Sequence, residues 1–336
     1  MGKKMGFSAA EIARRAGVSS ATVSRVLNNK GIVRQELVDR VAAALRDMGI
    51  EPHDAISQSP PPGKLILFTL PFDFNSFFNE IIRGAKASAV LHGYQLLILQ
   101  EHINQNTFPA FKKLLRDAKI SGLIALNHIE SDVLGKINAL APLVQCCDYD
   151  PASRQVSSVS LDDVKAAKQV MDYFASLGRR KIAFLSGSLK YKDNRCRKQG
   201  YLMGLSDMGV EPNDSWMVHL PEINYNMALS TATQILSQPN RPEAFFAISD
   251  LFASAVVNAA RRLNIRVPED LLVVGFDNVD YSEISSPTIT TVNTPKFQFG
   301  YAACELLIEK IQNPDAYTQH IFLPSELIVR ESTAAR

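Results

Sequence analysis

Apolar residues recur with helical spacing through the first fifty positions and gather into short continuous runs beyond residue 64. In the segment 8–29 two apolar groups, spaced three and four positions apart, stand on either side of Gly17. The pattern predicts two short helices, the first burying Ile12, Ala13 and Ala16 and the second burying Val23, Val26 and Leu27. It also predicts a third helix, closing at Gly49, that buries Leu37, Val38, Val41, Leu45 and Met48.

Local signals indicate where the first two helices begin and end. Ser8 followed by Glu11 is a capping box, in which the serine side chain accepts from the N3 amide and the glutamate returns to the amide of the cap. Ser19 is placed to cap the second helix, and Gly17 can take the left-handed conformation that turns the chain. The segment therefore has the form of a helix-turn-helix whose outer face carries small side chains and Arg25.

Beyond a connector at 52–63, apolar runs alternate with helical segments. The connector has little apolar content and ends in Pro-Pro-Pro-Gly, which favours an extended, semi-rigid chain. The predicted strands are 65–70, 94–100, 122–126, 143–147, 181–186, 217–221, 244–248 and 271–276, and the predicted helices include Asp163–Leu177, about Arg195–Met208 and Leu251–Leu263. This order predicts an α/β fold with two doubly wound parallel halves and a cleft at the carboxyl ends of their strands.

The charge distribution decides between a plain helical hairpin and a DNA-binding segment. Residues 1–50 hold nine Lys and Arg against four acidic residues, a net charge of +5, whereas the whole chain carries +2. The other 286 residues therefore carry about −3, so the basic charge is concentrated where phosphate contacts need it.

Composition excludes several other classes. With 336 residues, of which 46% are hydrophobic and 21% charged, the chain predicts two or three core-forming domains. The N-terminal residues lack the apolar stretch of an export signal and no later run could span a bilayer, so a cytoplasmic location without membrane contact is expected. Neither a metal site nor a cofactor is predicted, because the four cysteines, Cys146, Cys147, Cys196 and Cys304, show no ligand spacing and are interpreted as reduced thiols.

A set of motifs in a fixed order resembles the lactose-repressor (LacI/GalR) family of bacterial transcription regulators. The motifs are GVSSATVSRVLNN, PFDFNSFF with EIIRGA, SLGRRKIAFLSG, VPEDLLVVGFDN, SPTITTVN and ELIVRES, and the likeness spans about residues 7–332. Within the family the chain looks closest to the branch of the cytidine and purine repressors.

The resemblance implies a homodimer whose two heads bind a pseudo-palindromic operator in double-stranded DNA. It implies a helix-turn-helix domain at 1–51, a hinge at 52–63 and a periplasmic-binding-protein-like (type I) core at 64–336. The core would close on a small effector, a sugar or a nucleoside, between one subdomain of about 64–164 and 295–323 and another of about 165–292 and 324–336.

The resemblance also assigns residues to DNA. Ser20 and Ala21 fall where the recognition helix of the family discriminates bases, and a serine hydroxyl and an alanine methyl suit base edges. The full predicted DNA-contacting set is Ser8, Ser19, Ser20, Ala21, Thr22, Ser24, Arg25 and Asn28.

The effector site carries over in the same way. Phe77 and Phe78 match positions that stack on a ligand ring, with Phe78 preferred and a plain core role as the alternative. Arg197 and Asp277 match the effector-binding arginine and the acceptor of ligand hydroxyls. Asp250 either faces the cleft or caps the helix 251–263, and Tyr191 and Asp193 are predicted in a nearby loop.

The chain departs from the family pattern at the hinge. Where many relatives carry a leucine that wedges into the minor groove this chain has Ser59, so the nearest apolar candidate is Ile56 in a shifted register. We therefore expect weak operator bending or a flexibly tethered head. In the segment 221–226, Ile223 replaces a common pocket aromatic, with Tyr225 nearby.

Three other functions compete with a regulator. A solute-binding protein of a transport system would share the core but would carry an export signal and no helix-turn-helix. An enzyme would need a phosphate loop, a metal cluster or an activated nucleophile, and no such motif is found. A nonspecific DNA binder would have little need of a large ligand-binding core.

Overall fold

The computed structural model describes residues 8–27, 33–50, 64–71, 76–149, 153 and 155–334. The chain forms two compact units, Met1–Leu65 and Ile66–Arg336. The predicted hinge at 52–63, with Ile56 and Ser59, lies outside the described residues, as does Asn28. In the described part of the chain, no helix combines the length and the apolarity needed to cross a membrane.

The N-terminal unit contains helices α1 (Ala9–Ala16), α2 (Ser20–Leu27) and α3 (Gln35–Asp47). The predicted caps are confirmed: the Ser8 side chain accepts from the Glu11 amide at 3.3 Å and the Ser19 side chain accepts from the Thr22 amide at 3.0 Å. Gly17 ends α1 at φ 62°. The Glu11 carboxylate, expected to return to the cap, lies 3.8 Å from the Arg14 guanidinium.

The three helices enclose a small apolar core, whose buried residues are Ile12, Ala13, Ala16, Val23, Val26, Val41, Ala44 and Leu45. The predicted inner faces of α1 and α2 are thus confirmed, with Leu27 partly buried. Leu37 is partly exposed and lies outside this cluster. Arg40 of α3 closes the turn between α1 and α2 by donating to the carbonyls of Ala16 and Gly17, at 3.0 and 2.7 Å.

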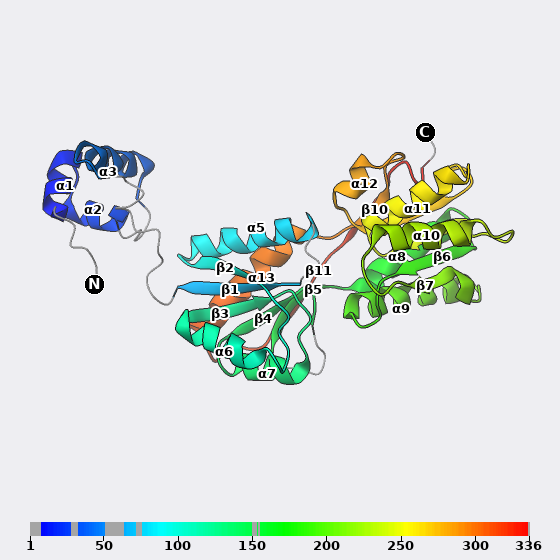
Figure 1. The fold of residues 1–336 in the computed structure, drawn as a ribbon, viewed down its shortest axis with the longest axis horizontal. Helices are drawn as coiled ribbons and strands as arrows, with labels where there is room; N and C mark the ends of the chain where they lie inside the picture. Colours follow the sequence, from blue (N-terminus) through cyan, green and yellow to red (C-terminus); the bar gives the residue numbers. More distant parts are fainter. Residues whose placement is uncertain are drawn as a thin grey trace. The chain divides into compact units, whose positions relative to one another are not determined.

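The first sheet of the C-terminal unit has the order β11-β5-β4-β3-β1-β2 (Figure 1). Its strands are β1 (Leu65–Leu70), β2 (Gln95–Gln100), β3 (Ile120–Ala125), β4 (Leu143–Cys146), β5 (Ser157–Leu161) and β11 (His320–Leu323). Helices α5 (Ser76–Leu91) and α13 (Lys296–Gln312) cover one face, and α6 (Phe108–Asp117) and α7 (Ser131–Asn138) cover the other.

The second sheet has the order β12-β10-β9-β8-β6-β7. Its strands are β6 (Ile182–Ser186), β7 (Met217–His219), β8 (Ala244–Ala247), β9 (Leu272–Asp277), β10 (Thr290–Asn293) and β12 (Glu326–Ile328). All adjacent pairs of this sheet are parallel except β10 with the edge strand β12. Its helices are α8 (Asp163–Ser176), α9 (Lys192–Asp207), the 3₁₀ turn η1 (Asp214–Trp216), α10 (Tyr225–Leu236), α11 (Asp250–Arg262) and α12 (Asp280–Ile284).

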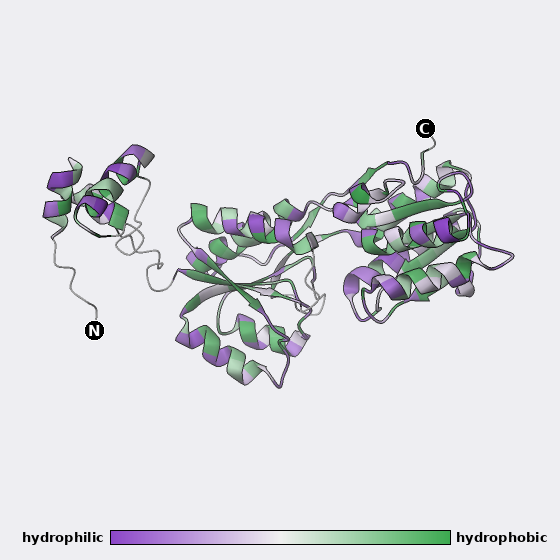
Figure 2. Cartoon of the chain, turned by 45° about the horizontal axis from the view of Figure 1, so that its top comes forward, coloured by the Kyte–Doolittle hydropathy of each residue, from purple (hydrophilic) through white to green (hydrophobic). Residues whose placement is uncertain are grey.

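The strands of both sheets are largely hydrophobic, whereas the helices that cover the sheets carry both hydrophobic and hydrophilic residues (Figure 2). Most strand residues of β1, β3 to β6, β8 and β9 are fully buried, as expected for sheets covered on both faces. The chain passes between the two sheets after β5, after β10 and after β11. These three connections agree with the predicted number of crossings, and the exact subdomain boundaries stay a prediction.

Helices α5 and α13 meet at two glycines. A Cβ atom at Gly84 would overlap the carbonyl oxygen of Phe297, and a Cβ at Gly300 would overlap that of Ile81. The two backbones therefore touch with no room for a side chain. Because α13 starts directly after a crossing, this contact fixes the start of α13 to the helix that carries Phe77 and Phe78.

Candidate functional site

A cavity of about 330 Å³ lies between the carboxyl ends of the two sheets. Its lining comes from residues that follow strands in both sheets, the position where ligands gather in open parallel sheets. On one side, the aromatic wall is formed by Phe77, Phe78 and Leu126. On the other side, the charged wall is formed by Asp163, Lys192, Asp193, Asn194, Arg197 and Asp277.

Arg197 is the centre of the charged wall. Its side chain is only 8% exposed, which excludes an ordinary surface arginine. Nε donates to Oδ1 of Asp163 at 3.0 Å and Nη1 donates to the carbonyl of Ile248 at 2.7 Å. The guanidinium carbon lies 3.6 Å from the ring centroid of Phe276, so ring and carboxylate together fix the plane of the fork.

Asp163 binds a second cation. Its Oδ2 accepts from Nζ of Lys192 at 3.1 Å, and the same Nζ donates to Oγ of Ser160 at 3.0 Å. Lys192 Nζ also stands 4.7 Å from the ring centroid of Tyr149. Burial opposes the charge of Lys192, but Asp163 outweighs it and leaves the pKa of the ammonium raised.

Asp277 stands at the end of β9 and faces the same cavity. Burial raises its pKa to about 6, against the opposing effect of Arg197. The nearest Arg197 nitrogen is 3.7 Å from Oδ1, which is an ion pair but too long for a hydrogen bond, and Oδ1 has no hydrogen-bond partner among the described residues. Asp277 and Asn278 both have positive φ, 94° and 50°, which is the strained turn that points the carboxylate into the cavity.

The first turn of α9 supplies the rest of the charged wall. Asp193 was predicted in a loop, but it is a residue of the helix, and Tyr191 is its N-cap position. Both line the cavity, and burial raises the pKa of Asp193. Asn194 is 3% exposed; its Nδ2 donates to the carbonyl of Ser188 at 3.0 Å, while its Oδ1 has no partner among the described residues.

The aromatic wall lies at the start of α5. Phe77 and Phe78 both line the cavity, and their rings meet edge to face with centroids 5.3 Å apart. Both also pack against the main core, so the ring-binding and core roles are not exclusive. Beside them, Nδ1 of His128 lies 3.1 Å from Oδ2 of Asp148, a hydrogen bond that raises the pKa of the imidazole.

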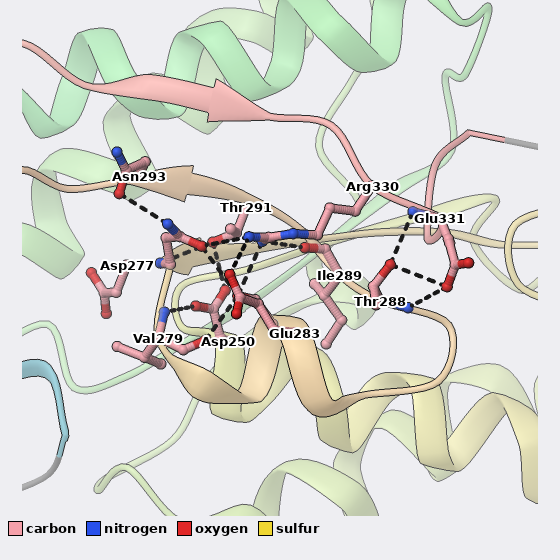
Figure 3. A network of polar contacts seen from close by, with 12 residues as sticks. Asp250, Asp277, Val279, Glu283, Thr288, Ile289, Thr291, Asn293, Arg330 and Glu331 are labelled. Atoms are coloured by element: carbon pink, nitrogen blue, oxygen red, sulfur yellow. Dashed lines mark hydrogen bonds and ion pairs between the residues drawn. The ribbon is translucent and has the colours of Figure 1, made fainter.

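Asp250 lies behind the cavity, and both predictions for it are corrected. Ser249 caps α11 by accepting from the Phe252 amide, and Asp250 is the first residue of the helix. Its side chain is fully buried away from the cavity, where Oδ2 accepts from the Val279 amide at 2.7 Å and Oδ1 accepts from Thr291 at 2.6 Å (Figure 3). Burial raises the pKa of Asp250 to about 8. Asp250 thus holds the turn that follows Asp277.

A polar network continues from this turn to the C-terminal segment. Arg330 donates to Oδ1 of Asn278 at 2.9 Å and to a carboxylate oxygen of Glu283 at 3.0 Å, which joins α12 to the turn (Figure 3). In the same view the Asp277 carboxylate makes no contact with the other residues drawn. The turn after Asp277 is therefore held by several contacts, whereas the Asp277 carboxylate itself has the long ion pair with Arg197.

In the N-terminal unit, α2 carries five of the eight predicted DNA-contacting residues, whereas Ser8 and Ser19 stand at the caps of α1 and α2. Ser20, Ala21, Ser24 and Arg25 are exposed, with Arg25 in the last turn. Thr22 is partly buried, and its hydroxyl lies 2.8 Å from that of Ser19. Apart from Arg25, these exposed residues have small side chains, which allow the helix to approach a DNA groove closely.

Several cavity residues were not predicted. Asp163 stands next to the helix cap Asp162, and spacing alone does not separate a capping acid from one that reaches Arg197. Lys192 and Asn194 lie in a polar run without apolar spacing, which delayed the predicted start of α9 to Arg195. Asn127 and His128 follow β3, and their position after a strand was the available signal.

Comparison with known proteins gives matches along nearly the whole chain. Residues 9–53 match the model of the bacterial regulatory proteins, lacI family, and residues 171–333 match the periplasmic binding protein-like domain. The HTH-type transcriptional repressor CytR of Escherichia coli (strain K12) is 30% identical over 330 residues, covering 97% of this chain and 96% of the relative. The chain belongs to the lacI family.

Two further regulators are similar to this chain over nearly their whole length. The HTH-type transcriptional repressor PurR of Photobacterium profundum is 27% identical, covering 96% of this chain and 97% of the relative. Among solved structures, the transcriptional regulator CelR in complex with cellobiose superposes with a TM-score of 0.73 at 24% identity, covering 97% of this chain and 99% of that one. The predicted architecture, a helix-turn-helix unit followed by a periplasmic-binding-protein-like core, is confirmed.

Proposed function

We propose that the protein is a cytoplasmic transcriptional repressor that binds an operator through α2 and releases or tightens it when a small effector occupies the cavity. The observation that carries this proposal is the presence, in one chain, of a helix-turn-helix with an exposed Ser20, Ala21 and Arg25 face and of a cavity with a buried polar wall. The names of the relatives support regulation rather than catalysis.

The proposed effector is a sugar or a nucleoside. Phe77 and Phe78 offer an apolar surface for a ring, and Arg197, Asp277 and Asp193 offer directional polar contacts on the opposite side. Tyr191, 43% exposed, stands at the rim of the cavity. The effector can change DNA affinity only by the difference between its affinities for two conformations of the core, so its contacts with the cavity must differ between them.

The proposed assembly is a homodimer on a pseudo-palindromic operator. Strand β2 is an edge of the first sheet, and it exposes Leu97 and Ile98 beside Val90 and Leu91 at the end of α5. Edge strands with exposed apolar residues are sites of pairing. We expect Leu97→Glu to shift the protein from dimer to monomer in sedimentation, and Glu130→Lys, a change away from this strip, to leave the dimer intact.

The experiment that tests the proposed function is selection of bound sequences from random duplex DNA. A palindrome with half-sites about one helical turn apart supports a dimeric repressor. Arg25→Ala is expected to weaken binding to that site about tenfold and to lower its salt dependence by about one phosphate contact. The matched control is Arg116→Ala, which changes an exposed residue of the C-terminal unit.

Deletion of residues 1–63 completes the test, because it should abolish DNA binding while effector binding survives. Absence of any enriched sequence, with affinity falling uniformly as salt rises, would contradict a sequence-specific operator.

A further inference from the structure

Protein groups engage part of the donors of the charged wall and leave Nη2 of Arg197 for a ligand, whereas two buried acceptors of that wall have no hydrogen-bond partner in the described part of the chain. Arg197 uses Nε for Asp163 and Nη1 for the Ile248 carbonyl, and Lys192 uses Nζ for Asp163 and Ser160. In contrast, Oδ1 of Asn194 and Oδ1 of Asp277 are buried without a partner among the described residues. A buried polar atom without a partner is unfavourable, so the ligand that completes this wall is a donor at both positions.

The charge of the lining residues also favours a ligand that donates hydrogen bonds. Five lining carboxylates, Asp148, Asp163, Asp193, Glu222 and Asp277, face two permanent cations, Lys192 and Arg197, both already paired with Asp163. Asp148 is satisfied by His128, and Glu222 is exposed at the mouth, where it accepts from Asn224. Among the described residues, the Asp277 carboxylate has only a long ion pair with Arg197, a guanidinium that Asp163 already binds, so the lining acids outnumber the lining cations.

We propose that the effector carries a protonated amine, which binds Asp277 and Asp193 and donates to Oδ1 of Asn194, while its ring lies against Phe77 and Phe78. The class is an amine-bearing monosaccharide or nucleoside. An ammonium provides up to three donors and one positive charge, whereas a hydroxyl provides one donor and no charge. A phosphate or carboxylate would be repelled by the lining acids, which outnumber the lining cations.

The titration of Asp277 supplies an independent signature. Arg197 on α9 and Lys296 on α13 lower its pKa, and Asp193 on α9 and Asp163 on α8 raise it. Asp250 on α11 also interacts with it, because the charge of Asp277 raises the pKa of Asp250. Burial is the largest effect, so Asp277 gains its charge near pH 6. Affinity for an ammonium should rise as the pH increases from about 5 to 7, whereas that for a neutral sugar should stay level.

This inference rests on the proposed function, since it names the ligand of the same cavity. The test measures binding of matched compounds to the full chain by calorimetry: glucosamine, galactosamine and mannosamine against their parent hexoses and N-acetyl forms, and 3′-amino-3′-deoxyadenosine against adenosine. We expect an amine to bind at least about tenfold more tightly than its neutral partner, as for a charge-assisted hydrogen bond.

Two variants remove charge and keep shape. Asp277→Asn and Asp193→Asn should each weaken the amine about 10- to 100-fold, and Asp277→Asn should also reduce the pH dependence near pH 6. The exposed Asp117→Asn is the control. Equal binding of parents and amines, or no binding of any amine, overturns the inference. The repressor function falls only if the DNA selection also gives no motif.

Discussion

The two walls of the cavity are built on opposite principles. In the aromatic wall, Phe77 and Phe78 pack against each other and against the main core, and their rings place few directional demands on a ligand. On the charged wall, Asp163, Lys192 and Arg197 are held by several bonds each, so their positions are determined before any ligand arrives. We infer that the aromatic wall can accept different rings, while the charged wall selects among ligands by the polar groups they carry.

The largest effect should follow removal of the centre of the charged wall. Arg197→Gln leaves the Asp163 and Asp277 carboxylates without a guanidinium, which should lower effector affinity by about 100-fold or more and destabilise the core by about 3–5 kcal/mol. Calorimetry and urea denaturation measure the two effects. The exposed Arg262→Gln serves as control. A variant that binds normally would show that the wall does not select.

The next largest effect is expected from a substitution in the contact between α5 and α13, which supports the aromatic wall. Gly300→Ala places a methyl group against the Ile81 carbonyl and should cost about 3 kcal/mol through displacement of α13 from α5. Gly135→Ala in α7 meets open space and should gain up to about 1 kcal/mol. The denaturation midpoints of the two variants measure this difference in stability. Equal midpoints would show that the contact between α5 and α13 is not tight.

A smaller effect is expected on the aromatic wall itself. Phe78→Ala removes ring contact and should weaken effector binding by about tenfold, with Phe77→Ala for comparison. Because neither ring titrates, the pH profile of binding should keep its shape. A changed profile would mean that the two walls are coupled rather than separate.

Measured per pH unit, the smallest effect on stability concerns the residue behind the charged wall. The pKa of Asp250 in the folded chain, about 8, lies above its ordinary value, so the folded state holds a proton that the unfolded state releases. This stabilisation is complete below about pH 4 and is lost as the pH rises through 8, with a slope of about 1.4 kcal/mol per pH unit at most. Asp250→Asn should flatten that part of the stability profile measured by denaturation at each pH.

The apolar pattern predicted the helices and strands well where burial alone shapes them. The helix-turn-helix follows from spacing, caps and Gly17, and the eight predicted strands are found in the structure. Strands β5, β10, β11 and β12 were not among the predicted strands, and the order of strands in each sheet was not predicted. The prediction failed at α9, whose buried positions Lys192, Asn194 and Arg197 are polar because they face the cavity. Sites built from charge break the pattern on which secondary-structure prediction depends.

The candidate site was predicted only in part. Arg197, Asp277 and the two phenylalanines line the cavity, as the resemblance implied. Asp250 could not be placed, because Ser249 and Asp250 are both good caps and only the contact with Thr291 separates them. Asp163 needed knowledge of which residues meet across 34 positions of sequence, and spacing does not provide that.

The double role of Asp163 also bears on how a new ligand preference could arise. One carboxylate holds both Lys192 and Arg197, so replacement of Asp163 would leave both cations without their shortest ion pair. A change at Phe78 or at Tyr191 on the rim leaves these ion pairs intact. A family of variants with different ligands is therefore most accessible through the rim of the cavity, with the three-residue ion cluster inherited as a unit.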